Sequence, residues 1–434
     1  MIVLIKIILV RMKTILLAGT HSGCGKTTIM LALLQALKAQ TANVTAFKAG
    51  PDFLDPLWHQ AVTGRASYNL DTHMVGEENS LKLMAAQAET ADVAVIEGAM
   101  GLFDGRSGVG GSGSSAELAQ RLNVPVFLVV DAQGMSGSIV PLVSGFVTYA
   151  EKMQVSIVGV IANQLGSEYH AQLLQEALHD HQLPPLIAWM EKNALNLPER
   201  HLGLVNPEAG IVPDFLPFFH VLIDDLRHLF AQRLKAVDQK PEARYLVDKT
   251  IAIAKDAACC FIYPANIDFL KQQGAKISYF SPIRGDAIPE NTDAVWLPGG
   301  YPELFAQALS VSSTWKSLAE FIQSGKPVLA ECGGAMLLGE SLRDLSEKTW
   351  PMANVLAYHS IMQNKLASLG YREEASGIKG HEFHHSVRQS ERELDPCFQV
   401  SRGDKGVRYK NLRASYVHWY FASAPEVIVS WLSE

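Results

Sequence analysis

A glycine-rich stretch near the N-terminus constrains the fold of this chain more than any other feature. It reads Gly19-Thr-His-Ser-Gly-Cys-Gly-Lys-Thr-Thr28 and lies between apolar runs at 14–18 and 29–37. The first run predicts a buried strand and the second a helix. A strand, a glycine-rich turn, Lys-Thr and a helix follow one another in a phosphate-binding P-loop. The sequence therefore predicts an α/β domain that binds phosphate at this turn.

The residue types in this stretch each have a physical role in binding phosphate. Gly19, Gly23 and Gly25 let the backbone N–H groups point at phosphate oxygens, and the start of the helix adds its positive dipole. Lys26 would reach the β- and γ-phosphates, and the Thr27 hydroxyl would coordinate Mg²⁺. The first glycine stands one position earlier than usual, which indicates a variant P-loop. The predicted ATP-binding residues are Gly19, Thr20, Ser22, Gly23, Gly25, Lys26, Thr27 and Thr28.

Composition and charge argue against several classes of protein. The chain has 434 residues, enough for two or three domains, and its 48% hydrophobic content is typical of globular proteins. A net charge of −7 argues against nucleic acid as the main partner. An odd number of cysteines without a framework spacing indicates reduced thiols in the cytoplasm. The apolar run at 1–10 is too short to span a membrane, and we expect Met12 to be the natural start.

Carboxylates follow two predicted strands of the first domain. Asp52 and Asp55 come just after the strand at 43–48, and the strand at 92–97 ends in Glu97. Ligands bind at the carboxyl ends of strands in open α/β sheets, and Mg²⁺ prefers carboxylate and phosphate oxygens. The predicted magnesium ligands are Thr27, Asp52 and Glu97. The alternative for Asp52 is a turn in which the side chain caps its own backbone.

Other polar residues of the first domain are candidates for contacts with ligands. Asp55 and Asp104 are expected to contact the substrate. Arg65 would either clamp an anion or lie exposed. Asn163 would either read adenine or end a strand, and His201 would be either structural or a general base.

Apolar strands alternate with helices along the first half of the chain, with further strands at 124–131 and 155–163. This alternation predicts a parallel, doubly wound sheet. A polar stretch between 231 and 249 indicates an interdomain linker, after which strands and helices alternate again. The predicted parts are an ATP-binding domain at 12–235, a linker at 236–249 and a second α/β domain at 250–434.

The second domain contains a candidate nucleophile. The stretch 326–338 reads as a strand, a Cys among small residues and a helix, which is the form of a nucleophile elbow around Cys332. We expect the helix N-terminus to lower the pKa of this thiol. Backbone N–H groups of Gly333 and of Gly299 and Gly300 would form an oxyanion hole for the substrate.

A Cys nucleophile requires a base, and His418 on the apolar strand predicted at 414–421 is the candidate. No third residue is evident, so the sequence predicts a Cys–His dyad. His381-Glu-Phe-His-His385 matches a zinc-protease pattern, but that pattern requires a helix. The alternation of residues here favours a strand, where the two imidazoles would be about 13 Å apart, too far for one zinc ion. We therefore expect this stretch to take part in substrate binding or in a domain contact.

Together these motifs resemble those of the cobyrinic acid a,c-diamide synthases, over residues 12–434. The members of this family usually carry a second His where Tyr420 stands here. The resemblance rests on 19–28, Phe47-Lys-Ala-Gly-Pro-Asp52, Glu97-Gly-Ala-Met-Gly-Leu-Phe-Asp-Gly105, Pro198-Glu-Arg-His-Leu-Gly203, Pro298-Gly-Gly-Tyr-Pro-Glu303, Ala330-Glu-Cys-Gly-Gly334, Gly380-His-Glu-Phe-His384 and Ala414-Ser-Tyr-Val-His418.

The resemblance implies a dethiobiotin-synthetase-like ATPase joined to a class I-type glutaminase. Such an enzyme uses ATP, Mg²⁺ and L-glutamine to amidate two acetate side chains of a corrin-type tetrapyrrole in cobalamin synthesis. Hydrogenobyrinic acid and nickel-sirohydrochlorin are alternative substrates. A partition-type regulatory ATPase is the alternative from another class, and the elbow at Cys332 argues against it. A homodimer is left open.

Overall fold

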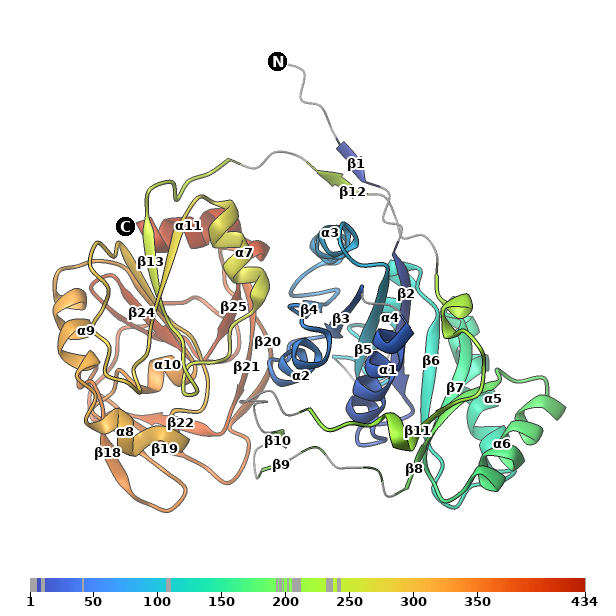
Figure 1. Cartoon of the computed structure of the whole chain (residues 1–434). Helices are drawn as coiled ribbons and strands as arrows, with labels where there is room; N and C mark the ends of the chain where they lie inside the picture. Colours follow the sequence, from blue (N-terminus) through green and yellow to red (C-terminus); the bar gives the residue numbers. More distant parts are fainter. Residues whose placement is uncertain are drawn as a thin grey trace. The chain divides into compact units, whose positions relative to one another are not determined.

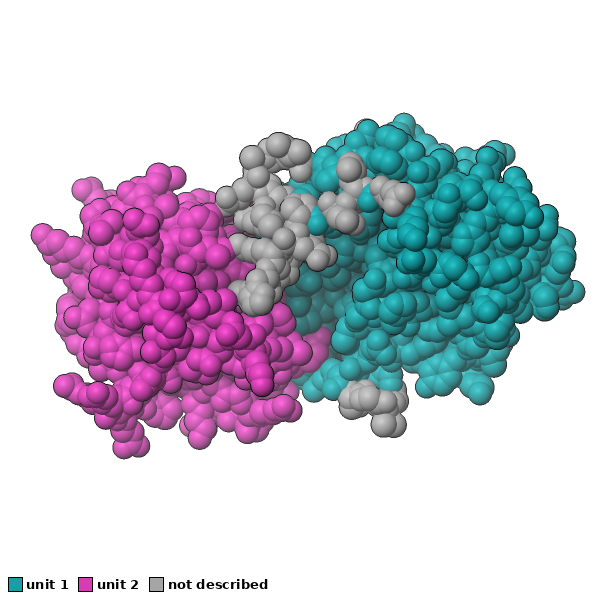
Figure 2. Space-filling view, turned by 90° about the horizontal axis from the view of Figure 1, so that it is seen from below, with its two compact units in different colours: residues 1–240 teal, residues 241–434 magenta. Residues whose placement is uncertain are grey.

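The computed structural model describes residues 6–8, 12–40, 43–106, 111–192, 194, 197, 199–200, 203–204, 212–231, 237–239 and 243–433. The chain divides into two compact units, Met1–Lys240 and Pro241–Glu434, which Figure 2 shows in two colours. This division falls within the stretch predicted as a linker. Among the described helices, none combines the length and the apolar character that crossing a bilayer requires.

An eight-stranded sheet forms the centre of the first unit (Figure 1). Its neighbouring strands are parallel except for one antiparallel pair at the edge. The predicted parallel, doubly wound sheet is therefore confirmed, with one antiparallel edge strand. In order across the sheet the strands are β11 (Phe219–Val221), β8 (Leu186–Glu191), β7 (Ile157–Leu165), β6 (Val126–Asp131), β2 (Lys13–Gly19), β5 (Val93–Gly101), β3 (Val44–Ala49) and β4 (Tyr68–Leu70).

Helices connect these strands and bury their apolar faces. The helix after the P-loop is longer than the predicted 29–37, and its apolar residues from Ile29 to Leu34 are fully buried. Ser114 caps the helix that follows it by accepting a hydrogen bond from the Glu117 N–H (3.1 Å). The helices are α1 (Lys26–Gln40), α2 (Leu54–Thr63), α3 (Glu77–Ala88), α4 (Ser115–Leu122), α5 (Ile139–Lys152) and α6 (Glu168–Asp180).

The carboxyl ends of three adjacent parallel strands bring the predicted site together. β2 leads into the P-loop, β3 leads into the turn at 50–53, and β5 carries Glu97 opposite Lys48 of β3. These ends lie at one edge of the sheet because β2, β5 and β3 are neighbours that run in the same direction. This is the edge at which open α/β sheets bind ligands.

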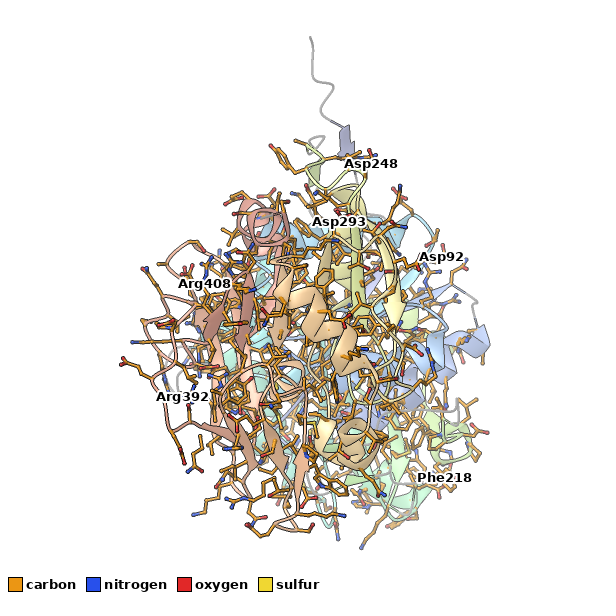
Figure 3. All side chains as sticks on the ribbon, turned by 90° about the vertical axis from the view of Figure 1, so that its left-hand side faces the viewer. Asp92, Phe218, Asp248, Asp293, Arg392 and Arg408 are labelled. Carbon is orange, nitrogen blue, oxygen red and sulfur yellow. The ribbon has the colours of Figure 1, made fainter. Side chains whose placement is uncertain are left out.

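The second unit is built on a six-stranded sheet, parallel except at one edge. Asp293, labelled in Figure 3, accepts a hydrogen bond from the Thr250 N–H (2.8 Å) and so joins two of its strands at their start. In order across the sheet the strands are β14 (Lys276–Phe280), β13 (Thr250–Ala254), β15 (Ala294–Leu297), β16 (Val328–Glu331), β24 (Leu412–Ser415) and β23 (Val407–Tyr409). Its helices are α7 (Pro264–Gln272), α8 (Ala306–Ser310), α9 (Thr314–Gln323), α10 (Gly333–Met336) and α11 (Pro425–Ser433).

Two smaller antiparallel or mixed sheets complete this unit. They correct the prediction of one apolar strand at 414–421, because the chain leaves the large sheet after Ser415 and pairs again in a smaller sheet from His418. One small sheet contains β18 (Thr349–Pro351), β17 (Ser341–Arg343), β19 (His359–Met362) and β22 (Ser386–Gln389). The other contains β20 (Ser368–Glu373), β21 (Lys379–His384) and β25 (His418–Tyr420).

The predicted linker contains a short strand. Residues Val237–Gln239 form β12, which pairs in antiparallel register with β1 (Lys6–Ile8). Part of the segment predicted to be dispensable therefore pairs with part of the predicted linker.

Candidate functional site

The P-loop has the backbone that its glycines predict. Gly23 and Gly25 adopt φ values of 84° and 88°, which a side chain disfavours. A Cβ on Gly19 would lie 2.2 Å from the Cys24 sulfur, so this glycine allows the loop to fold back on the end of β2. The loop is therefore shaped by backbone geometry that only glycine supplies at these positions.

Asn163 holds the P-loop from β7, which is separated from β2 by β6 in the sheet. Its Nδ2 donates a hydrogen bond to the Cys24 carbonyl (3.0 Å), and a Cβ on Gly25 would lie 2.1 Å from the same nitrogen. Asn163 therefore lies within β7 and not in a turn after it, and its side chain contacts the backbone of the P-loop. Arg65 donates to the carbonyl of Thr90 (3.2 Å). His201 lies outside the described residues.

Thr27 and Glu97 are brought into direct contact. The Thr27 hydroxyl donates to Glu97 Oε1 (2.8 Å), although 70 residues separate them. Lys26 is 9% exposed and its ammonium lies 3.5 Å from the His21 carbonyl. Burial is the main cause that lowers the pKa of Lys26, and nearby anionic groups partly offset it.

Sequence reasoning missed two residues that surround Glu97. Lys48 forms ion pairs with Asp55 and with Glu97 Oε1 (3.3 Å). His59, which is fully buried on α2, contacts Glu97 Oε2 through Nε2 (2.7 Å) and the Ser67 hydroxyl through Nδ1 (3.0 Å). Lys48 lies within the motif 47–52, which could have signalled it, whereas nothing local to His59 indicates this contact.

The contacts around Glu97 affect the pKa values of the carboxylates at this edge of the sheet. Burial alone would raise the pKa of Glu97, but Lys48 and His59 outweigh it and lower that pKa to about 2. Burial together with the Asp55 charge raises the pKa of Asp52 to about 7. Burial and Glu97 also raise the pKa of Asp55. Glu97 is thus the carboxylate that stays ionised most readily.

Asp52 and Asp104 both cap turns of their own backbone. Asp52 Oδ1 accepts hydrogen bonds from the N–H groups of Leu54 (2.8 Å) and Asp55 (3.0 Å). This is the turn that the sequence allowed as the alternative for Asp52. The exposed Asp104 accepts from the Gly101 N–H (2.9 Å) through Oδ2. One oxygen of each carboxylate is therefore already engaged in a turn.

The donor set at this edge fits Mg²⁺. A Thr hydroxyl in contact with an ionised carboxylate, beside a phosphate-binding loop, matches the oxygen ligands that Mg²⁺ takes together with phosphates and water. Within the described parts of the chain, no three His, Cys, Asp or Glu side chains form a ready metal cage. A nucleotide would therefore have to supply further oxygens.

Cys332 lies on a strained elbow in the second unit. It follows β16 and precedes α10 with φ 46° and ψ −112°, a conformation that non-glycine residues rarely adopt. Its N–H donates to the Ser415 carbonyl (2.7 Å), so the neighbouring strand holds the turn. A Cβ on Gly333 would lie 3.0 Å from the Gly300 nitrogen, which shows how closely the two glycine segments approach. The predicted elbow is formed.

One glycine, Gly299, lies beside both Cys332 and His418. A Cβ on Gly299 would lie 3.2 Å from the Cys332 Cβ and 2.3 Å from the His418 Cε1. Both side chains therefore face the same glycine, although 86 residues of sequence separate them. The structure brings together the nucleophile and the base that the sequence predicted, and it places Gly299 and Gly300 beside them.

His381, from the stretch predicted to take part in substrate binding or a domain contact, lies beside His418, a contact that the sequence did not predict. It lies opposite His418 in the β21–β25 pair, and its Nδ1 is 2.9 Å from the Tyr263 hydroxyl. The stretch 381–385 is extended, as predicted, because residues 379–384 form β21. Glu382 of this stretch pairs with the buried Arg372 (2.5 Å).

The predicted thiolate is wrong for this structure. Burial raises the pKa of Cys332 to about 12, and the Gly333 N–H offsets this only in part. Burial also lowers the pKa of His418 well below its ordinary value, with His381 and His384 adding to the effect. Desolvation outweighs the short helix α10, so the thiol and the imidazole are both neutral at pH 7.

A cavity of about 390 Å³ lies near the elbow. Ser386 in its wall donates to the sulfur of Met336 in α10 (3.3 Å). Side chains of both charges line the cavity. Arg388 pairs with Asp404 (3.0 Å), and Glu382 is also part of the lining. The charged side chains of the lining are thus already engaged, Arg388 with Asp404 and Glu382 with Arg372, and apolar side chains make up much of the rest.

Comparisons with known proteins agree with this two-part organisation. The CobQ/CobB/MinD/ParA nucleotide binding domain matches residues 15–204, and the CobB/CobQ-like glutamine amidotransferase domain matches residues 250–426. The chain is 35% identical to the cobyrinate a,c-diamide synthase of Priestia megaterium, over 97% of both chains. It is 37% identical to that of Herminiimonas arsenicoxydans, over 95% of both chains.

A hydrogenobyrinate a,c-diamide synthase of Brucella anthropi is also 37% identical, over 94% of this chain and 98% of the relative. Identity of this extent, over nearly the whole length of relatives with both units, shows the family. The chain therefore belongs to the family of cobyrinate and hydrogenobyrinate a,c-diamide synthases.

Proposed function

We propose that this protein amidates the a and c acetate carboxylates of cobyrinic acid, with ATP and glutamine as co-substrates. The observation that carries the proposal is the presence in one chain of a P-loop site and a Cys–His site, each with the local geometry that its chemistry requires. Hydrogenobyrinic acid is the second candidate, because a relative with that name matches equally well. Nickel-sirohydrochlorin remains a further alternative, and a partition-type ATPase would not need the second site.

The first unit would activate the substrate carboxylate. A carboxylate is a poor electrophile, so its oxygen attacks the γ-phosphorus of ATP, the bond to the ADP oxygen breaks, and an acyl phosphate forms. Lys26 and the N–H groups of the P-loop would bind the transferring phosphoryl group. Lys48 would add a second cation, since burial lowers its pKa but the ion pairs with Asp55 and Glu97 outweigh burial, raise that pKa and keep it charged. Asp55 and Asp104 remain the proposed substrate contacts.

We assign Thr27 and Glu97 to Mg²⁺, with Asp52 as a third ligand through the oxygen that its turn does not use. The ion would neutralise charge on the phosphates. His59 would orient Glu97 by its contact with Oε2. Thr20, Ser22, Gly23, Gly25 and Thr28 complete the proposed nucleotide contacts.

The second unit would release ammonia from glutamine. The Cys332 sulfur attacks the amide carbon while its proton passes to His418, which then donates it to the leaving ammonia. Water hydrolyses the thioester to glutamate and restores the thiol. Backbone N–H groups near Gly299, Gly300 and Gly333 would stabilise the oxyanion.

Ammonia then attacks the acyl phosphate and releases phosphate, which leaves an amide. A cytoplasmic location suits the five free thiols. A homodimer remains a prediction, which the molar mass in solution would test.

Two variants test whether the two units perform separate steps of the reaction. Cys332→Ala should abolish glutamine-dependent amidation and retain ammonia-dependent amidation, whereas Lys26→Ala should abolish both. Glutamine turnover by Cys332→Ala would rule out the proposed nucleophile, and full activity of Lys26→Ala would rule out the acyl phosphate. Mass gain per amide with cobyrinic acid, hydrogenobyrinic acid and nickel-sirohydrochlorin would identify the macrocycle.

A further inference from the structure

The residue immediately before the nucleophile is a buried acid. Glu331 ends β16 and is 1% exposed. Its Oε2 accepts a hydrogen bond from the Trp296 indole (3.0 Å), and its Oε1 accepts one from the backbone N–H of Trp419 (2.9 Å). Burying a carboxyl group is costly, so a residue of this kind at this position requires an explanation.

One of these two hydrogen bonds connects the part of the fold that carries Cys332 to the part that carries His418. Glu331 precedes Cys332 in the six-stranded sheet, and Trp419 follows His418 in the three-stranded sheet. Among the described strands, no backbone ladder joins these two sheets. The Glu331 carboxyl therefore links the backbone of the nucleophile to the backbone of the base directly, across 88 residues of sequence.

We propose that Glu331 is a positioning residue for glutamine hydrolysis, whose buried carboxyl fixes the backbone of Cys332 relative to the backbone of His418. The second bond, from Trp296 in β15, fixes the carboxyl itself. The relative position of the two backbones matters for the reaction, because the base must meet the thiol at hydrogen-bond distance.

The neutral form of the carboxyl suits this role. Burial raises the pKa of Glu331 to about 8, and the hydrogen bonds from Trp419 and Trp296 offset this only in part. At pH 7 the carboxyl therefore adds no full negative charge beside Cys332. Such a charge would disfavour the anionic form of the Cys332 sulfur. This role rests on the proposed functions of Cys332 and His418.

Glu331→Gln and Trp296→Phe test the proposal. The first keeps size and neutrality but offers one acceptor oxygen for two N–H donors, and the second removes only the indole donor. For Glu331→Gln we expect glutamine-dependent kcat to fall about tenfold to a hundredfold, as for misplaced reacting groups, with KM for glutamine unchanged. For Trp296→Phe we expect a fall in kcat of about fivefold, as for one hydrogen bond. Ammonia-dependent amidation should be unchanged in both.

Trp315→Phe is the matched control. The Trp315 indole is also buried in this unit, but it donates to the Leu309 carbonyl (2.6 Å) and not to Glu331. It should lose stability without losing glutamine-dependent kcat. The melting temperature of each variant separates a loss of fold from a loss of positioning.

Three results would overturn the role of Glu331. One is a wild-type kcat in folded Glu331→Gln, and another is a wild-type kcat in Trp296→Phe, which decides the matter if the first variant does not fold. The third is that Trp315→Phe, with the same loss of melting temperature as Glu331→Gln, also shows the same fall in kcat. Cys332→Ala is measured beside them. If it keeps glutamine turnover, the proposed nucleophile is wrong, whereas if it loses turnover and the other variants keep it, only the positioning role is wrong.

Discussion

The imidazoles of His381 and His418 stack on each other, with ring centroids 5.0 Å apart and planes 19° apart. They lie directly opposite in the antiparallel β21–β25 pair, so the strand register determines the stack. His381 is itself held by the Tyr263 hydroxyl (2.9 Å). Its pKa is lowered to about 3, chiefly by burial, so it is neutral at pH 7. The proposed base therefore rests against a neutral ring of fixed orientation.

Replacing His381 should slow glutamine hydrolysis. His381→Phe keeps a flat ring but loses the contact with Tyr263, and we expect the glutamine-dependent kcat to fall about tenfold because His418 is less well oriented. His381 also contributes to the low pKa of His418. The acid limb of the rate profile should therefore move to higher pH in the variant.

The rate of glutamate release, followed from about pH 4 to about pH 9, measures both effects. His359→Phe, an exposed change on β19 of the same unit, is the control and should leave the profile in place. An unmoved acid limb in His381→Phe would mean that the stacked ring does not influence the base.

The substitution His59→Ala should impair amidation by the first unit but not glutamine hydrolysis by the second. Without its contact to Oε2, Glu97 loses one of the groups that orient it, and we expect amidation to fall by about tenfold to a hundredfold with glutamine or ammonia as the nitrogen source. Glutamate release without the macrocycle should persist. Product mass and glutamate assays distinguish the two steps.

A conservative change provides the control for His59. The amide nitrogen of His59→Gln can replace Nε2 as a donor to Glu97, so this variant should recover most of the activity that His59→Ala loses. Ser67→Ala removes only the partner of Nδ1 and should have a smaller effect. Equal losses in all three variants would indicate a role in packing alone.

The two positive-φ glycines of the P-loop should differ in their tolerance of a methyl group. Alanine at either site should cost about 1 to 2 kcal/mol of stability through backbone strain. A Cβ on Gly25 also collides with Asn163, whereas a Cβ on Gly23 meets nothing within 4 Å. Gly25→Ala should therefore lose more ATP turnover than Gly23→Ala, and adding Asn163→Ala should restore part of the difference. Equal turnover in the two single variants would contradict this.

Glu331 should give the stability of the second unit a recognisable pH dependence. Its pKa is about 8 in the folded protein and about 4.3 in an unfolded chain, so the folded state holds a proton that the unfolded state loses between these values. The resulting stabilisation is complete below the lower value and falls by about 1.4 kcal/mol per pH unit as pH rises toward 8.

The difference in free energy of unfolding between wild type and Glu331→Gln, followed as a function of pH, isolates this effect. Buried neutral histidines act in the opposite direction, but only below their ordinary pKa of about 6.5. Denaturant unfolding between that pH and 8 should therefore show a falling wild-type free energy and a flatter one in the variant. Parallel curves would mean that Glu331 is ionised in the folded protein.

Much of both sites is determined by local sequence. The P-loop and the elbow each consist of a strand, a turn with small residues and a helix, and the residues within about ten positions dictate that geometry. The parallel sheet of the first unit follows from buried strands alternating with helices. The extended form of 381–385 follows from the alternation of its residues.

The partners of these local motifs depend on tertiary structure. His59 lies 38 residues from Glu97, and Trp419 lies 88 residues from Glu331, so only the packing of distant strands reveals those contacts. The charge of Cys332 depends on packing as well, since a short helix favours the thiolate but complete burial outweighs it. By itself the sequence determined which residues can react, because motifs fix the backbone nearby. The tertiary structure decided what surrounds those residues, because burial and hydrogen bonding depend on segments that are distant in the chain.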